Sequence, residues 1–241
     1  MTADILKKKP DPMVVALEDF GGNLNWAVKA ISRRIKTNAD GDTTLLALHF
    51  AVNVGDEGFE IISQLESLEV LDATDSAITN EGLKPLGQMP KLRDLILDIC
   101  EIDDDALPHL SPAHSLRRLS LSGTRIGDPG LPHLSGLTNL ESLNLSSTNV
   151  TNRGLEFLSG LSKLTHLDLS ECNIRDPGMA HLRSLRHLRQ LSLNYNRISD
   201  EGAQWLKGMG EMELLHLKGN FITEEFLRVL IESMPGAKIH T

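Results

Sequence analysis

Apolar residues recur along most of this chain with a constant spacing of 24 residues. In LSLSGTRIGDPGLPHL, residues 119–134, leucines first alternate with polar residues and then follow the spacing of a helix face. The alternation predicts a short strand, because successive side chains of a strand point to opposite faces. The later spacing predicts a short helix. Each 24-residue unit is therefore expected to be a strand, a turn and a helix.

Seven such units follow one another without a gap, from the unit that begins at Leu68 to the one that begins at Met212. We number the positions of each unit from 1, so that Leu68 is at position 1. Positions 4 and 6 are expected to form buried rows, since stacked parallel strands lie about 4.8 Å apart. Position 4 is leucine throughout: Leu71, Leu95, Leu119, Leu143, Leu167, Leu191 and Leu215.

Position 13 is Asp or Asn in six of the seven units, which predicts the start of a helix. We expect residues such as Asp128 to cap the helix of their own unit, with Pro129 on its first residue. Pro108 and Pro132 indicate that the helices are short or partly 3₁₀. A glycine recurs at position 15, where a side chain is expected to crowd the adjacent turn: Gly82, Gly130, Gly154, Gly178 and Gly202.

The unit LRRLSLSGTRIGDPGLPHLSGL, residues 116–137, follows the pattern LxxLxLxxTxIxDxGLxxLxxL. It resembles the 24-residue repeats of bacterial leucine-rich repeat proteins, and the resemblance covers about residues 44–235. The resemblance implies an α/β fold, a right-handed solenoid or horseshoe. Its parallel β-sheet would line the concave face, and short α- or 3₁₀-helices would cover the convex face. The resemblance is specific for fold but weak for function, because architecture and not a reaction defines the family.

The pattern divides the chain into three predicted parts. Residues 1–43 form an N-terminal cap of a helix and a strand, which also looks like the cap of some bacterial leucine-rich repeat proteins. Residues 44–235 hold one degenerate repeat and the seven regular ones, and residues 236–241 form a terminal capping strand. Ile239 falls at position 4 of an eighth unit, whereas the first strand segment, LLALHF, is out of register by one residue.

Within the cap, DPMVVALEDF is expected to form a helix that Gly21-Gly22 ends. Apolar residues then alternate at Leu24, Trp26 and Val28, which predicts a strand. Asp40-Gly41 is expected to form the turn into LLALHF.

Net charge and composition exclude several classes of partner. The formal net charge of −9 disfavours nucleic acid and anionic membranes, which need a basic surface. No apolar run approaches the roughly 20 residues of a membrane span, and MTADILKKKP lacks the apolar core of a signal peptide. We therefore expect a cytoplasmic protein. Cys100 and Cys172, the two cysteines, stand at position 9 among small polar residues, where they are expected to support the loops and not to form a disulfide.

In this family, positions 3, 5, 7 and 8 face the concave surface, which is the usual binding face of a solenoid. In this chain they are acidic near the N-terminus, beside the apolar Ile96 and Ile99, small and polar in the middle, and richer in chemistry toward the C-terminus. Tyr195 is the only tyrosine, a residue type that often anchors interfaces. The candidate partner-binding residues are Asp72, Asp94, Ile96, Asp98, His166, Asp168, Asn194, Tyr195, His216 and Lys218.

Other chemistry is weakly indicated. His109, His133 and His181 share position 18, but no carboxylate or cysteine completes a metal-ligand set there. NADGD and EIDDD lack the spacing of a calcium loop, and the arginines of RSLRHLR flank core leucines and are expected to be a solvated turn. His166 and Asp168, with Ser142 or Ser192, have the residue types of a triad. Same-face residues of one strand nevertheless lie about 6.8 Å apart, too far for the required contact. We therefore expect no catalytic residue, metal or cofactor.

The leading hypothesis is a non-enzymatic module that binds a protein partner on its concave sheet. The alternative depends on ISDEGAQWL, residues 198–206, which is similar to repeats of F-box leucine-rich repeat proteins. That resemblance implies the substrate-recognition subunit of a ubiquitin ligase, or a bacterial effector that imitates one. The first 43 residues hold no F-box-like helical segment, so this role would need a separate adaptor.

Overall fold

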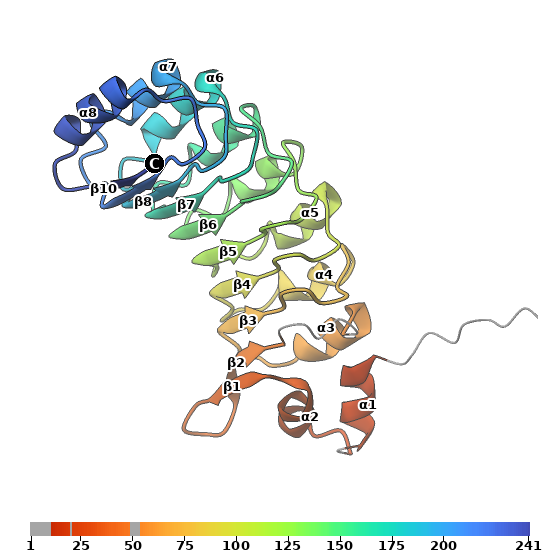
Figure 1. Ribbon diagram of the computed structural model, residues 1–241. Coiled ribbons are helices and arrows are strands. Elements are labelled where there is room, and N and C mark those ends of the chain that lie inside the picture. Colours follow the sequence, from red (N-terminus) through yellow and green to blue (C-terminus); the bar gives the residue numbers. More distant parts are fainter. Residues whose placement is uncertain (1–10, 20, 49–53) are drawn as a thin grey trace, which may run out of the picture.

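The computed structural model describes residues 11–19, 21–48 and 54–241, which form one curved stack of strands and helices (Figure 1). The ten strands of these described residues belong to a single sheet and are ordered as in the chain. The strands line the inner side of the curve, and the helices cover its outer side (Figure 1). The strands are β1 Arg34–Thr37, β2 Thr43–Ala47, β3 Val70–Asp72, β4 Asp94–Ile96, β5 Arg118–Ser120, β6 Ser142–Asn144, β7 His166–Asp168, β8 Gln190–Ser192, β9 Leu214–His216 and β10 Lys238–His240.

The leucines at position 4 form the continuous row that the spacing predicts. From β2 to β10 all neighbouring strands are parallel, and Leu119 stands opposite both Leu95 and Leu143. Each position-4 leucine from Leu71 to Leu215 is at most 2% exposed. Since every strand holds only three residues in the regular repeats, this shared burial and not strand length stabilises the sheet. The predicted solenoid fold is confirmed.

The outer helices are short, as the prolines predict. Pro132 lies in a 3₁₀-helix of four residues, where the missing i→i−4 hydrogen bond does no harm. The outer elements are α3 Asp56–Ile62, α4 Leu83–Leu86, η1 Asp104–Ala106, α5 Leu107–Leu110, η2 Leu131–Leu134, η3 Gly154–Leu158, α6 Asp176–Met179, η4 Ala180–Ser184, α7 Asp200–Ala203, η5 Gln204–Leu206 and α8 Glu224–Ser233.

The carboxylates at position 13 link each repeat to the next one. Asp128 accepts a hydrogen bond from the backbone N–H of Thr151 at 2.7 Å and another from its hydroxyl group at 2.6 Å. Asp176 and Asp200 make the same pair of contacts with position 12 of the following repeat. The prediction that position 13 caps its own helix was wrong. The side-chain caps observed are at position 12, on Asp103, Ser199 and Thr223.

The glycines at position 15 make room for these links. A Cβ atom on Gly154 would lie 2.6 Å from Oδ1 of Asp128, and one on Gly202 would lie 2.4 Å from Oδ1 of Asp176. Both distances are far below van der Waals contact. The prediction that a side chain would crowd the adjacent turn is confirmed, and the crowded group is the linking carboxylate.

The N-terminal segment differs from its prediction in one element. Helix α1, Pro12–Asp19, forms as predicted and ends before Gly21 and Gly22, which both have positive φ. Residues Leu24–Ile31 form a second helix, α2, so the strand predicted at Leu24 was wrong. Ala27 and Val28 are fully buried, and with the partly buried Leu24 and Ile31 they occupy one helical face. The alternation of Leu24, Trp26 and Val28 hid that spacing.

Strand β1 follows α2 and pairs antiparallel with β2, so residues 38–42 form the turn predicted at Asp40-Gly41. Asp11, the residue directly before α1, accepts hydrogen bonds from the N–H groups of Gly55 and Gly58, at 2.6 and 3.3 Å. Asp104 makes the same two contacts with Gly127 and Gly130, so Asp11 acts like a position-13 carboxylate. Helix α1 therefore lies where the helix of one more repeat would lie before α3. Residues 1–10 lie outside the described chain.

The first and last strands follow the predicted register. Leu46 stands opposite Leu71, a spacing of 25 residues and so one more than the repeat, while His49 and Phe50 lie outside the described residues. Ile239 stands opposite Leu215 in β9, as position 4 of an eighth unit should. One sheet continues from β1 to β10, so it crosses both predicted boundaries. The division into residues 1–43, 44–235 and 236–241 therefore stays a prediction that depends on the regularity of the sequence.

Candidate protein-binding surface

The sheet carries the predicted binding residues on its inner side. Position 4 is buried, so positions 3 and 5 of the same strand face away from the core. Strand pairing then brings residues of one position side by side along the stack: Ser142 stands opposite His166, and Asn144 opposite Asp168. The strands hold Asp72, Asp94, Ile96, His166, Asp168 and His216, and the turns directly after them hold Asp98, Asn194, Tyr195 and Lys218.

The acidic residues near the N-terminal end are partly held by the sheet itself. Asp72 accepts hydrogen bonds from the N–H and hydroxyl groups of Thr74, at 3.1 and 2.7 Å. Asp98 accepts from the N–H of Ser122 at 2.9 Å and from the hydroxyl of Ser120. These hydrogen bonds therefore fix the direction of both carboxylates within the chain itself.

Asp94 lies in a different environment, beside the half-buried Ile96. Partial burial raises the pKa of Asp94, and the guanidinium group of Arg118, 3.7 Å away, opposes that effect. The pKa of Asp94 is therefore higher in the folded state than in the unfolded state. As the pH rises above the unfolded-state pKa, ionisation of Asp94 lowers the stability of the folded protein. A cationic group of a partner placed on Asp94 would relieve this effect.

The C-terminal part of the surface holds rings and amides. Tyr195 is 52% exposed, and Lys218 Nζ lies 5.7 Å from the centre of its ring. The rings of His216 and His240 stack with their centres 4.9 Å apart. His240 is absent from the predicted set, although its 24-residue spacing from His216 could have revealed it.

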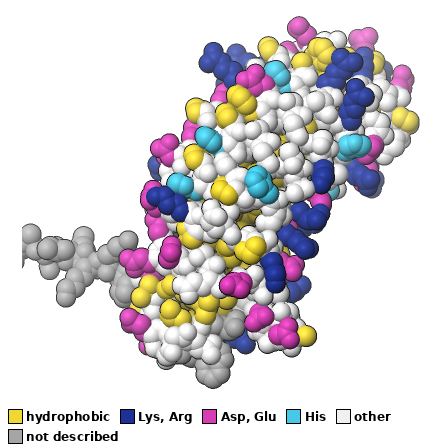
Figure 2. Space-filling model, turned by 180° about the vertical axis from the view of Figure 1, so that it is seen from behind, with side chains coloured by type: hydrophobic (Ala, Val, Ile, Leu, Met, Phe, Trp, Pro, Cys, Tyr) yellow, Lys and Arg dark blue, Asp and Glu magenta, His cyan; other side chains and the backbone are white. Residues whose placement is uncertain are grey.

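The residues of the considered triad have other partners. Nδ1 of His166 lies 2.8 Å from the Thr165 hydroxyl oxygen, and Asp168 accepts a hydrogen bond from the N–H of Ser170 at 2.8 Å. The described contacts thus give His166 no orienting carboxylate. Within residues 11–19, 21–48 and 54–241, no three His, Cys, Asp or Glu side chains converge as metal ligands. On the face that Figure 2 shows, the histidines are spaced apart and not gathered.

The acidic motifs have structural roles. Asp104 of EIDDD accepts hydrogen bonds from the N–H groups of Gly127 and Gly130, at 2.7 and 3.1 Å. Asn38 of NADGD accepts from the N–H groups of Asp40 and Asp42 and so closes the turn between β1 and β2. Both motifs use their oxygens to hold backbone.

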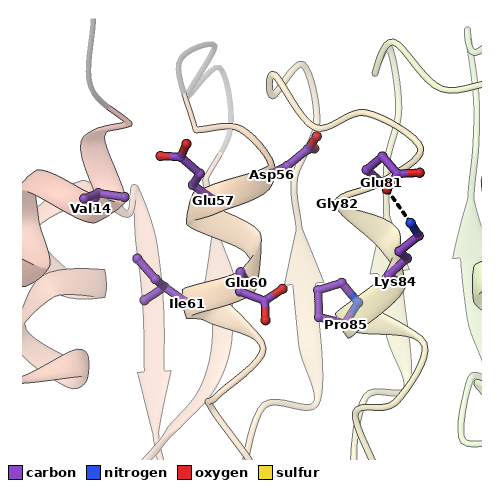
Figure 3. Close-up of a pocket in the computed structure, with 9 residues that line it drawn as sticks. All are labelled: Val14, Asp56, Glu57, Glu60, Ile61, Glu81, Gly82, Lys84 and Pro85. Carbon is purple, nitrogen blue, oxygen red and sulfur yellow. Dashed lines mark hydrogen bonds and ion pairs between the residues drawn. The ribbon is translucent and has the colours of Figure 1, made fainter.

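A groove lies on the outer side of the stack, away from the sheet (Figure 3). It runs between α1, α3 and α4 and has a volume of about 540 Å³. Its acidic side chains are partly engaged: both oxygens of Asp56 bind Thr79, and Glu81 pairs with Lys84. The groove therefore forms a surface separate from the concave candidate. Its lining residues are Val14, Asp56, Glu57, Glu60, Ile61, Glu81, Gly82, Lys84 and Pro85.

Both cysteines are buried free thiols at position 9. Cys172 donates to the carbonyl oxygen of Leu145, with Sγ and O 2.9 Å apart, and Cys100 donates to that of Ala73 at 3.3 Å. Asn196 is the position-9 residue of the repeat after that of Cys172, and its side-chain oxygen accepts hydrogen bonds from the N–H groups of Cys172 and Ile174. The row satisfies loop backbone groups, as predicted.

Cys100 and Cys172 should resist modification. Burial raises the pKa of both thiols, so the reactive thiolate is scarcer than in a free cysteine. We expect a water-soluble thiol reagent at mildly alkaline pH to leave both unmodified in the folded protein and to modify both in guanidinium chloride, as counted by mass spectrometry. Rapid labelling of either thiol in the folded protein would contradict its place in the buried row.

The comparisons with known proteins agree with this geometry. Family models described as leucine rich repeat match residues 114–174 and 184–206. A comparison with curated protein sequences finds no significant match. No helix in the described part of the chain is both long and apolar enough to span a bilayer.

Solved structures share the fold at low sequence identity. Internalin C2 of Listeria monocytogenes is 24% identical with a TM-score of 0.68, and the match covers 95% of this chain and 92% of that one. The internalin inlF of the same organism is 22% identical with a TM-score of 0.62, over 85% of this chain and 65% of that one. The plant peptide hormone receptor RGFR1 in complex with RGF2 is 18% identical with a TM-score of 0.55, over 81% and 31%. These structures show the same fold, and the matching family models together with the buried leucine rows show that the chain is a leucine-rich repeat protein.

Proposed function

We propose that this chain is a non-enzymatic interaction module that binds a protein partner on its concave sheet. Leucine-rich repeat domains generally act in protein–protein interaction, and one of the similar structures is a receptor in complex with RGF2. The observation that supports the proposal is the ten-stranded sheet, which fixes side chains from all repeats in one register. A rigid surface of this kind binds without the ordering cost that flexible loops carry.

The ligase alternative gains no support from the described residues. Helices α1 and α2 bury Met13, Ala16, Ala27 and Val28 in the core and therefore cover the first repeats. Both helices therefore use their buried apolar faces to cap the stack. The free, buried thiols agree with a cytoplasmic location, which is our proposal for where the protein acts.

The combined substitution Tyr195→Ala and Lys218→Ala should weaken partner binding at least about tenfold, because an aromatic anchor that a partner buries is often worth more than about 1.4 kcal/mol. The partner would be captured from the native cell, identified, purified and titrated by calorimetry. Trp205→Ala with Lys207→Ala is the matched control, since it removes an aromatic residue and a lysine from the outer side. Equal affinity of the wild type and the Tyr195/Lys218 variant would place the binding site on another face.

A further inference from the structure

Position 8 of every regular repeat has a left-handed backbone. Its φ angle lies between 53° and 73° in all seven repeats, and glycine occupies the position only at Gly123 and Gly219. Glycine adopts this conformation without strain, whereas a β-branched or bulky residue does not. Ile99, with φ of 60°, and Tyr195, with φ of 53°, therefore carry steric strain that their neighbours at Gly123 and Gly219 avoid.

The same two residues expose large apolar side chains. Ile99 is 60% exposed and Tyr195 is 52% exposed. Neither side chain is buried in the core, so the free energy of hydrophobic burial offsets little of the backbone strain. Strained residues of this kind concentrate at functional sites, where the side chain serves a purpose other than folding.

Each of these side chains lies over a glycine of the following repeat. A Cβ atom on Gly219 would lie 2.5 Å from Cδ1 of the Tyr195 ring, and one on Gly123 would lie 3.4 Å from Cγ1 of Ile99. Any larger residue at Gly219 would displace the ring. The glycines thus leave room for two apolar side chains to rest in defined places on the surface.

The surface from Ile99 to Tyr195 is acidic, and it is hollowed beside Tyr195. Glu171, Asn173 and Tyr195 line an open hollow of about 460 Å³. From the repeat of Ile99 to that of Tyr195, positions 5, 7 and 8 hold three carboxylates and no lysine or arginine, which gives a net charge of −3: Asp98, Asp168 and Glu171. At position 3, Asp94 and Arg118 oppose each other. A partner that crosses this surface is favoured if it carries positive charge.

We propose that Ile99 and Tyr195 are the two anchor points of the concave face, and that they bind an extended, basic segment of the partner protein. This rests on the proposed concave binding function. The anchors are four repeats apart, or about 19 Å at about 4.8 Å per strand. An extended chain covers that distance in about six residues. The segment therefore places one apolar side chain on each anchor and a lysine or arginine between them, beside Glu171.

Glycine substitutions separate this role from a structural one. Ile99→Gly and Tyr195→Gly relax the left-handed backbone, so the thermal midpoint should stay unchanged or rise, whereas a structural residue would lower it. The probe is a random display library of linear peptides about twelve residues long, which is twice the required span. Peptides selected on the wild-type protein are synthesised and titrated by fluorescence anisotropy against each variant. Ser147→Gly is the control, because Ser147 has the same backbone conformation without an apolar side chain.

We expect selected peptides with two apolar residues about six apart and a basic residue between them. Each anchor variant should reduce their affinity at least tenfold, while Ser147→Gly changes it less than twofold. Peptides without that pattern, or a lower thermal midpoint with intact binding in the anchor variants, would overturn the proposal. Binding that survives both anchor variants but is lost in Asp168→Ala with His216→Ala would overturn the anchors alone. Binding that survives all of these variants would overturn the concave function as well.

Discussion

Replacing Leu143 by alanine should lower the free energy of unfolding by about 3 kcal/mol. Leu143 is 1% exposed and stands in the middle of the position-4 row, opposite Leu119 on one side and Leu167 on the other. Removal of its side chain loses the transfer free energy of the missing carbons and leaves a cavity between two repeats. Each strand of the regular repeats has only three residues, so few other side chains of the strand could move into that cavity.

Urea titration followed by circular dichroism measures this change. Ser142→Ala is the control, because Ser142 lies in the same strand, at position 3 on the concave side. That substitution should change the free energy of unfolding by less than about 0.5 kcal/mol. A loss below about 1 kcal/mol for Leu143→Ala would show that the row is not a sealed core.

The buried rows could be predicted from the sequence because each repeat places the same residue type at the same position of its strand. Along the sheet, a leucine at position 4 stands opposite the position-4 leucines of the neighbouring repeats, so the 24-residue spacing itself predicts the pairing of Leu95, Leu119 and Leu143. The small polar row at position 9 follows from the same argument. Period alone is sufficient where the partner of a residue is its own equivalent in the next repeat.

Prediction failed where the partner is a different position. Asp128 before Pro129 and Gly130 has the local signature of a helix cap, but its carboxylate meets Thr151, 23 residues further on. A local signal describes the nearest backbone in sequence, whereas the nearest N–H group in space belongs to the next turn. At Leu24–Ile31 the mistake was of another kind, because one set of apolar residues fits two periods and only burial decided between them.

The candidate surface shows the same division. Its face could be predicted, since side chains alternate along strands, and the register places the strand members of the concave set on one side of the sheet. The special status of Ile99 could not be predicted from its residue type, because isoleucine gives no sign of a positive φ angle. The signal available was the glycine that stands in its column at Gly123 and again at Gly219.

The links between repeats give the second large effect. Asp128→Ala should lower the free energy of unfolding by about 2 to 3 kcal/mol, because it removes two hydrogen bonds to a charged acceptor and leaves the N–H of Thr151 without its partner. Gly154→Ala should also destabilise, by about 1 to 3 kcal/mol, although alanine is otherwise the better helix residue. The reason is the 2.6 Å between a Cβ atom there and Oδ1 of Asp128.

The two substitutions should not add. Once the carboxylate of Asp128 is gone, the closest atom no longer opposes the added methyl group on residue 154, whereas Cδ1 of Leu131 at 2.7 Å and Cγ1 of Val150 at 3.3 Å from the new Cβ atom still have to move. The double variant should therefore be more stable than the sum of the single losses predicts, by at least about 0.5 kcal/mol in a double-mutant cycle of urea titrations. Additive losses would mean that Gly154 is required by the leucine and not by the link. In that case the glycine column and the carboxylate column would be two separate requirements of the repeat, and the carboxylates would join repeats without deciding which residues the next helix can hold.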